Sequence, residues 1–208
     1  MHNRAFYKSY RCLLLVISLC AFFNCAAQNV DIDVLRDINL CRNRSLDGTM
    51  KVITNFDYPV SIAIPATELV WGYVHHDKQA VVNGLQTVAG YGINFVVTFG
   101  LKYSVQRSRP FVTYPDLQPY ETYTDYSFPS GHSSFAFCAA TSLSICYPKW
   151  YVIAPAYLWA AAVGYSRLDL GVHYPSDVLA GAIIGAGSSW LANKGNKWLR
   201  GKVKKLKG

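Results

Sequence analysis

Three short polar segments hold side chains whose types and spacing suit chemistry on a phosphate group, and the first is residues 102–110. Lys102 and Arg109 are seven residues apart, so a helix would place them on one face, two turns from each other. Arginine offers planar paired donors that match a phosphate, and lysine adds a compact point charge. Pro110 would end the helix. Taken alone, the segment also fits a juxtamembrane anchor, which is how we interpret Arg107.

The second segment, residues 128–132, reads Phe-Pro-Ser-Gly-His and leads directly into an apolar stretch. Ser130 is placed to cap a following helix, and Gly131 would let a ligand approach the backbone closely. The unpaired N–H groups and the positive dipole end of such a helix start form a natural site for phosphate. His132 would then protonate a departing oxygen. The simpler alternative is an ordinary helix cap beside a hydrogen-bonded histidine.

The third segment, residues 166–177, contains His173 and Asp177 four positions apart. At that spacing the carboxylate can reach one imidazole nitrogen, fix the tautomer and leave the other nitrogen free to attack. Arg167 would hold another phosphate oxygen. The competing interpretation is a capping aspartate beside a surface histidine.

Apolar stretches must position these three segments, and they cover residues 58–74, 81–101, 133–147, 151–165 and 178–192. About 20 helical residues cross a hydrocarbon layer, and each polar segment lies at the end of one stretch. A chain that crosses a bilayer alternately would bring all three ends to one face. We therefore predict an all-α helical bundle, integral to a membrane, with the active site at its outer face. It has five transmembrane helices, or six if residues 1–27 are a first transmembrane helix and not a signal peptide.

Charge indicates the orientation of this bundle. Only 15% of the residues are charged, below the roughly 25% typical of soluble domains. Residues 194–208 hold seven Lys and Arg and no acid, which predicts a basic cytoplasmic tail. Residues 28–57 would be a polar periplasmic segment, with a short amphipathic helix around Val30–Leu40 at the membrane surface, and residues 58–193 the catalytic domain. No recognition motif accompanies the charge, so nucleic acid is not an expected partner.

Together the three segments read Lys-x6-Arg-Pro, Pro-Ser-Gly-His and Ser-Arg-x5-His-x3-Asp. This pattern resembles the signature of the type 2 phosphatidic acid phosphatase superfamily, across roughly residues 58–193. The resemblance implies a nucleophilic His173, an Asp177 that stabilises its imidazolium, and a His132 that protonates the leaving group. The phosphate-binding residues that it implies are Lys102, Arg109, Ser130, Gly131 and Arg167. Because these cations take the role that a metal has elsewhere, the resemblance implies no metal and no cofactor.

The resemblance also implies a phosphorylated lipid as substrate, hydrolysed through a phosphohistidine. Phosphatidic acid, phosphatidylglycerol phosphate, undecaprenyl pyrophosphate and lipid A are all candidates. The expected location is the bacterial cytoplasmic membrane, with the site facing the periplasm and the loop 111–128 shaping the headgroup pocket. Two alternatives stay open. A soluble periplasmic nonspecific acid phosphatase would use the same chemistry, and a non-catalytic membrane protein would use the cations only to bind phosphate or lipid headgroups.

Overall fold

A computed structural model describes residues 30–207, and in this part of the chain every regular element is a helix. The elements are a helix over residues 30–40, η1 (Arg44–Leu46), α2 (Asp47–Val74), α3 (Lys78–Val105), α4 (Pro110–Thr113), α5 (Gly131–Cys146), α6 (Trp150–Asp169) and α7 (Pro175–Lys207). The all-α prediction is confirmed. The predicted signal peptide or first transmembrane helix, residues 1–27, lies outside the described residues.

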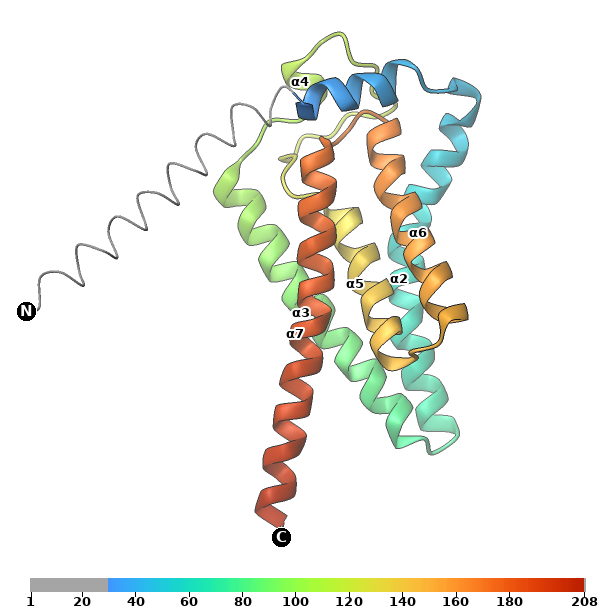
Figure 1. Ribbon diagram of the computed structural model, residues 1–208, viewed down its shortest axis with the longest axis vertical. Coiled ribbons are helices and arrows are strands. Elements are labelled where there is room, and N and C mark those ends of the chain that lie inside the picture. The colour runs from blue at the N-terminus through green and yellow to red at the C-terminus, as the bar shows by residue number, and fades with distance from the viewer. Residues whose placement is uncertain (1–29, 208) are drawn as a thin grey trace, which may run out of the picture.

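The long helices form one bundle, in which α5 contacts α2, α3, α6 and α7 (Figure 1). Two glycines let α7 approach α5 closely. A Cβ at Gly181 would lie 2.6 Å from the carbonyl oxygen of Ser130, and one at Gly185 would lie 2.0 Å from that of Ser134. This packing brings the starts of the two helices together, where the backbone N–H of Ser130 donates to the carbonyl oxygen of Asp177 at 3.0 Å.

The polar residues that interrupt the apolar stretches lie between helices. The side-chain amide of Asn94 on α3 donates to Oγ of Ser134 on α5 at 3.2 Å. Oγ1 of Thr87 on α3 donates to Oε2 of Glu68 on α2 at 3.1 Å. Such bonds satisfy polar groups that water does not reach. Where these helices meet, polar side chains, several of them small, therefore line the interior of the bundle.

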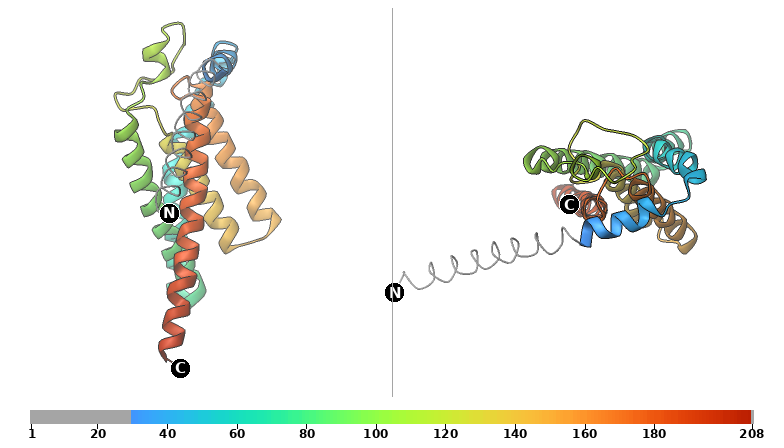
Figure 2. Two further views of the ribbon diagram at one scale, coloured as in Figure 1. Left: turned by 60° about the vertical axis from the view of Figure 1, so that its left-hand side comes forward. Right: turned by 90° about the horizontal axis from the view of Figure 1, so that it is seen from above.

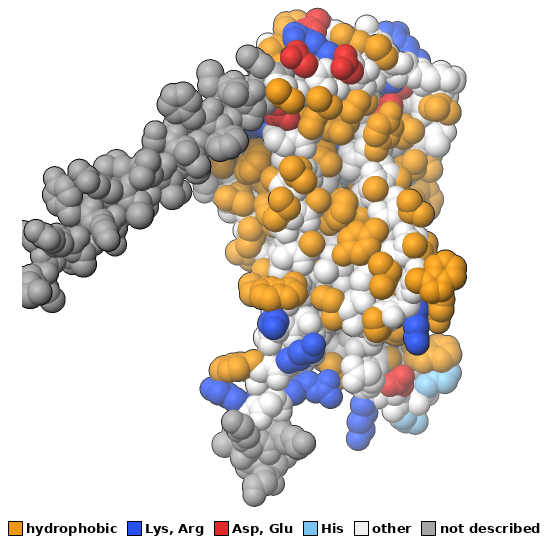
Figure 3. Space-filling model, in the orientation of Figure 1, with side chains coloured by type: hydrophobic (Ala, Val, Ile, Leu, Met, Phe, Trp, Pro, Cys, Tyr) orange, Lys and Arg blue, Asp and Glu red, His pale blue; other side chains and the backbone are white. Residues whose placement is uncertain are grey.

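Large apolar side chains lie on the outside of the bundle, as at Val96, Leu158 and Ile183. On the face shown in Figure 3 they cover the middle of the molecule, while Lys and Arg side chains gather toward the C-terminal end. Soluble monomers rarely expose so large an apolar surface. By length and composition, one helical stretch of the described residues, Lys78–Thr113, could cross a membrane.

Residues 30–40 form a helix where the amphipathic helix was predicted, and it lies across one end of the bundle (Figures 1 and 2). Its apolar side packs onto the protein itself, because Ile32 and Leu35 are buried against Leu117 and Tyr174. The helix is therefore part of the end of the bundle where the three polar segments meet.

The expected boundary between the polar segment 28–57 and the catalytic domain 58–193 falls inside α2, which begins at Asp47. An acidic residue suits a helix start, and this one also binds Nε of Arg42 at 2.9 Å. Thr54, in the second turn of the helix, is buried in the bundle. The first turns of α2 therefore belong to the same folded unit as the apolar stretch that follows them.

Candidate active site

The ends of four helices converge at the end of the bundle that carries the helix of residues 30–40 (Figure 1). Lys102 lies in the last turn of α3, and Arg167 lies in the last turn of α6. Ser130 caps α5, Asp177 lies in the first turn of α7, and His173 lies in the connection between α6 and α7. The fold therefore brings the three polar segments together at one end of the bundle, as we predicted from the sequence.

His173 and Asp177 form a buried pair. Nδ1 of His173 lies 3.5 Å from Oδ2 of Asp177, and both side chains are almost wholly enclosed. The same Oδ2 accepts hydrogen bonds from the backbone N–H of Tyr174 at 3.0 Å and from Oγ of Ser127 at 2.5 Å. Burial lowers the pKa of His173 to about 4, against the opposing hydrogen bond to Asp177. The imidazole is therefore neutral at physiological pH, with Nδ1 toward the carboxylate and Nε2 on the other side.

Arg109 lies on the Nε2 side of His173, with its Nη1 at 3.3 Å from that nitrogen. Its Nη2 binds Oδ1 of Asp125 at 2.5 Å, and Lys102 binds Oδ2 of the same carboxylate at 2.9 Å. Although burial opposes it, the hydrogen bond from Lys102 and the charge of Arg109 hold the pKa of Asp125 below its usual range. Two predicted phosphate ligands are thus bridged by a carboxylate from the loop 111–128.

Arg167 is buried, and Nη1 of its guanidinium donates to Oγ1 of Thr54 at 3.2 Å. Nε and Nη2 have no hydrogen-bond partner among the described residues. The guanidinium carbons of Arg167 and Arg109 lie 5.3 and 4.6 Å from the centroid of the same ring, that of Tyr123. Buried donors in native proteins almost always have acceptors, and the two free donors of Arg167 suit the oxygens of an anion such as phosphate.

The start of α5 has the predicted cap. Oγ of Ser130 accepts from the backbone N–H of Ser133 at 3.4 Å, and Gly131 is the first residue of the helix. His132 follows it, partly buried, with its ring centroid 4.7 Å from that of Tyr58 on α2. The structure thus brings all eight predicted site residues to one end of the bundle.

The interpretation of Arg107 as a juxtamembrane anchor is wrong. Its guanidinium donates to Asp177 and to Asp31 at 2.7 Å each, inside the site. Sequence reasoning also missed Asp125 and Ser127, which lie four and two positions before Pro129 of the Pro-Ser-Gly-His segment. That proximity was the only signal in the sequence, and the carboxylate of Asp31 had none.

In the part of the chain that the structure describes, no three His, Cys, Asp or Glu side chains gather as metal ligands would.

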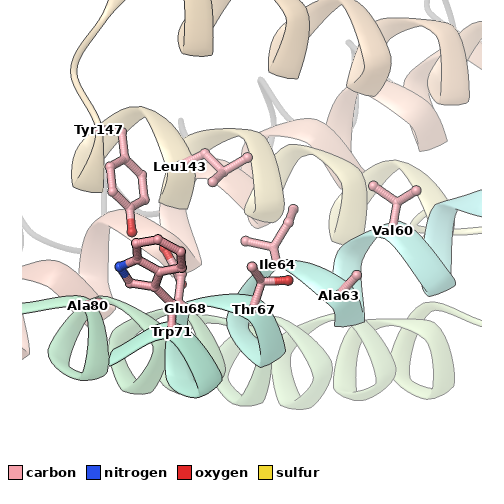
Figure 4. A pocket seen from close by; sticks show the side chains of 9 residues that line it. All are labelled: Val60, Ala63, Ile64, Thr67, Glu68, Trp71, Ala80, Leu143 and Tyr147. Carbon is pink, nitrogen blue, oxygen red and sulfur yellow. The ribbon is translucent and has the colours of Figure 1, made fainter. Parts of the chain in front are cut away.

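An apolar cavity of about 630 Å³ lies between α2 and α5, lined in part by Trp71, Tyr147 and the buried Glu68 (Figure 4). It is near the opposite ends of these helices and contains none of the predicted site residues, so we assign it no role in the chemistry.

Comparison with known proteins identifies the family. The family model of the PAP2 superfamily matches residues 83–200. An undecaprenyl-diphosphatase of Sulfolobus acidocaldarius is 31% identical over 186 residues, 86% of each chain. A lipid A 4'-phosphatase of Bacteroides thetaiotaomicron is 42% identical over 66 residues, 32% of this chain and 29% of that protein. The crystal structure of a transmembrane PAP2-type phosphatidylglycerolphosphate phosphatase from Bacillus subtilis matches with a TM-score of 0.70 and 28% identity, over 92% of this chain and 96% of that one.

These matches and the all-helical fold define the class: a bundle of the kind found in transmembrane PAP2 phosphatases. The chain belongs to the PAP2 superfamily, as its three motifs predicted. Its relatives are phosphatases of lipid phosphates and diphosphates.

Proposed function

We propose that the protein is a membrane phosphatase that hydrolyses a phosphomonoester or pyrophosphate of a lipid, through a phosphohistidine at His173 and without a metal. The observation that carries the proposal is the buried guanidinium of Arg167, whose Nε and Nη2 are without acceptors among the described residues. The guanidinium of Arg109 lies over the ring of Tyr123, as that of Arg167 does, and beside Nε2 of His173. A phosphoryl group between these residues would meet both the free donors and the nucleophile.

In the first step Nε2 of His173 attacks phosphorus in line, and the new P–N bond forms as the P–O bond to the lipid breaks. His132 gives its proton to the leaving oxygen. Asp177, next to Nδ1, stabilises the positive charge that develops on the imidazole. The phosphoryl oxygens bind the cations Lys102, Arg109 and Arg167.

In the second step His132, now neutral, takes a proton from water, and the oxygen of that water attacks phosphorus. The P–N bond breaks, phosphate leaves, and His173 returns to its neutral state. The hydroxyl of Ser130 and the backbone amide of Gly131 hold a phosphoryl oxygen at the positive end of α5. Asp125, which binds Lys102 and Arg109 in this structure, has to leave them when the phosphoryl group arrives.

A lipid substrate is supported by the relatives and by the large apolar side chains exposed on the outside of the bundle, which we call the apolar belt. The lipid would present its headgroup at the end of the bundle while its chains stay in the bilayer. We place the protein in the bacterial cytoplasmic membrane, with the site facing the periplasm and residues 194–208 inside. An undecaprenyl-diphosphatase is 31% identical to this chain over 86% of its own length, so a polyprenyl diphosphate is the first substrate to test.

The test is phosphate release by the purified full chain in detergent, with phosphatidic acid, phosphatidylglycerol phosphate, undecaprenyl pyrophosphate and lipid A. We expect turnover of at least one lipid in EDTA, and a loss of about a thousandfold or more in His173→Ala and in His132→Ala. A ³²P-labelled substrate should leave an alkali-stable label on the wild-type protein and none on His173→Ala.

Each part of the proposal has its own contrary result. Undiminished phosphate release by a folded His173→Ala protein would rule out the phosphohistidine intermediate. Loss of activity in EDTA, restored by a divalent cation, would rule out the metal-free mechanism. Tight binding of these lipids with no release of phosphate from any of them would favour the non-catalytic alternative.

A further inference from the structure

We infer that Arg107, held by Asp31, is a positioning residue that keeps the Asp177 carboxylate against His173 and so couples the helix of residues 30–40 to the reacting imidazole. The inference rests on the proposed function, because it requires His173 to be the nucleophile. It concerns how that nucleophile is oriented and charged. It adds two residues that the three motifs do not specify, Arg107 at an x position of the first motif and Asp31 outside all three.

Arg107 lies between α3 and α4, and its guanidinium bridges two carboxylates. Nη1 donates to Oδ1 of Asp177 at 2.7 Å, and Nη2 donates to Oδ2 of Asp31 at 2.7 Å. Its Cζ lies 3.7 Å from the centroid of the Tyr174 ring, so the guanidinium is stacked as well as paired. Asp177 has no exposed surface and Asp31 only 7%. Leaving either buried carboxylate without its partner would be unfavourable, so this bridge is expected to be well ordered.

The bridge determines how Asp177 faces His173. Oδ2 of Asp177 lies beside Nδ1 of His173, whereas Oδ1 points to Arg107. A carboxylate with both oxygens bound cannot rotate about its terminal bond without breaking a hydrogen bond. A planar guanidinium fixes such a plane in a way that a single ammonium does not. Without Arg107, the Asp177 carboxylate would keep only the two hydrogen bonds to Oδ2, from Ser127 and from the backbone N–H of Tyr174, and its plane would no longer be fixed against His173.

Asp31 connects the bridge to the N-terminal helix. Its Oδ1 accepts from the backbone N–H of Ser176 at 2.8 Å, and its Oδ2 accepts from Oγ of Ser176 at 2.5 Å. A carboxylate at this place satisfies a free N–H at the start of α7 and suits the helix dipole. Asp31 therefore holds both Arg107 and the first turn of the helix that carries Asp177.

Arg107 also affects the charge that His173 experiences. The charged or titratable groups that face His173 come from four parts of the fold. They are Arg109 after α3, His132 on α5, Arg167 on α6 and Asp177 on α7. Asp177 favours the protonated imidazole, and the positive charge of Arg107 partly offsets that influence. Because Ser127 and the backbone N–H of Tyr174 still hold Oδ2 of Asp177 beside His173, removing the charge of Arg107 is expected to raise the pKa of His173 and move the acidic limb of the rate profile to higher pH.

The experiment measures kcat, KM and the pH dependence of kcat/KM for the full chain in detergent, with Arg107→Ala, Arg107→Lys and Asp31→Asn. For Arg107→Ala we expect kcat to fall about tenfold or more, because misplaced catalytic groups cost that much, with KM changed by less than about twofold. Its acidic limb should move to higher pH. Arg107→Lys should restore the limb but only part of kcat. Asp31→Asn should lower kcat with little movement of the limb.

Arg36→Ala is the matched control, because Arg36 ties the same helix to the loop 111–128 through Asp116 at 2.8 Å, away from Asp177. It should leave kcat and the acidic limb unchanged. If Arg107→Ala and Arg107→Lys, both folded by thermal unfolding, behave like Arg36→Ala, the inference is overturned. Equal loss of kcat in Arg36→Ala would also overturn it, since tethering of the helix alone would then be the cause. An active His173→Ala protein would instead refute the proposed function.

Discussion

The neutral imidazole of His173 leads to the first prediction at the scale of single residues. Burial lowers its pKa to about 4, the hydrogen bond to Asp177 opposes this, and the charge of Arg109 adds to the lowering. A nucleophile needs its lone pair, so activity is present above this pKa and is lost as pH falls through it. We expect kcat/KM to keep its neutral value down to mildly acidic pH and to decline toward pH 4, as measured by phosphate release across pH.

Ionisation of the substrate has to be separated from that of His173. The second pKa of a phosphomonoester is about 6, so its titration is followed by ³¹P NMR and divided out of the rate profile. The decline that remains belongs to the free enzyme. A remaining acidic limb close to 6.5, the ordinary value for histidine, would show that the imidazole is not desolvated as the structure indicates.

The same residues show how much of the site could be read from the sequence. His173 and Asp177 were predictable as a pair because four positions along the chain is a local geometry. Arg107 was misinterpreted because its two partners are 70 and 76 positions away, and no local pattern records such contacts. Asp125 was missed for a similar reason, since its hydrogen-bond partners Lys102 and Arg109 lie before the long loop that carries it.

Among the elements, the helix boundaries at the site were predicted unevenly: the start of α5 after Ser130 was predicted correctly, and the end of α3 was not. The prediction that Lys102 and Arg109 share one helical face with Pro110 at its end was wrong. The helix α3 ends at Val105, Arg109 is the extended residue before α4, and Pro110 begins α4. The start of α2 at Asp47 was not predictable from hydropathy. Its first turns are polar, and they are helical because buried groups such as Thr54 bond to Arg167 and Ser166 across the bundle.

The loop 111–128 gives a prediction at the scale of elements. Asp125 binds Lys102 and Arg109 as a phosphate would, and its pKa is held low, so it competes with substrate as an anion at neutral pH. Asp125→Asn removes that charge. We expect KM and the inhibition constant for vanadate, a phosphate mimic, to fall about threefold to tenfold, which corresponds to the roughly 0.5–1.5 kcal/mol net contribution of a typical hydrogen bond.

Asp116→Asn is the control for this loop, because Asp116 pairs with Arg36 at the surface and touches neither Lys102 nor Arg109. Exposed pairs contribute little, so KM should stay at the wild-type value. Weaker vanadate inhibition in Asp125→Asn would mean that Asp125 helps to hold the anion. In that case the two cations would need their carboxylate partner in the bound state.

At the scale of the whole molecule, the apolar belt and the basic residues 194–208 predict how the chain lies in a membrane. The exposed Cys41 is at the end of the bundle that carries His173, and the exposed Lys149 is at the opposite end, between α5 and α6. If the site faces the periplasm, a membrane-impermeant thiol reagent should label Cys41 in intact spheroplasts. In a Cys41→Ser background, Lys149→Cys should be labelled only after the membrane is permeabilised.

The labelling result depends on the chain staying in the membrane fraction, so osmotic shock and a high-salt wash come first, and detergent should be required for release. Loss of the label in Cys41→Ser shows that the signal comes from this residue and not from the other cysteines of the chain. Release by osmotic shock would support the soluble periplasmic phosphatase instead. If Lys149→Cys in its Cys41→Ser background were labelled in intact spheroplasts while Cys41 of the wild-type chain was not, the orientation would be reversed. The phosphate site would then lie on the cytoplasmic face, contrary to the positive-inside tendency of residues 194–208.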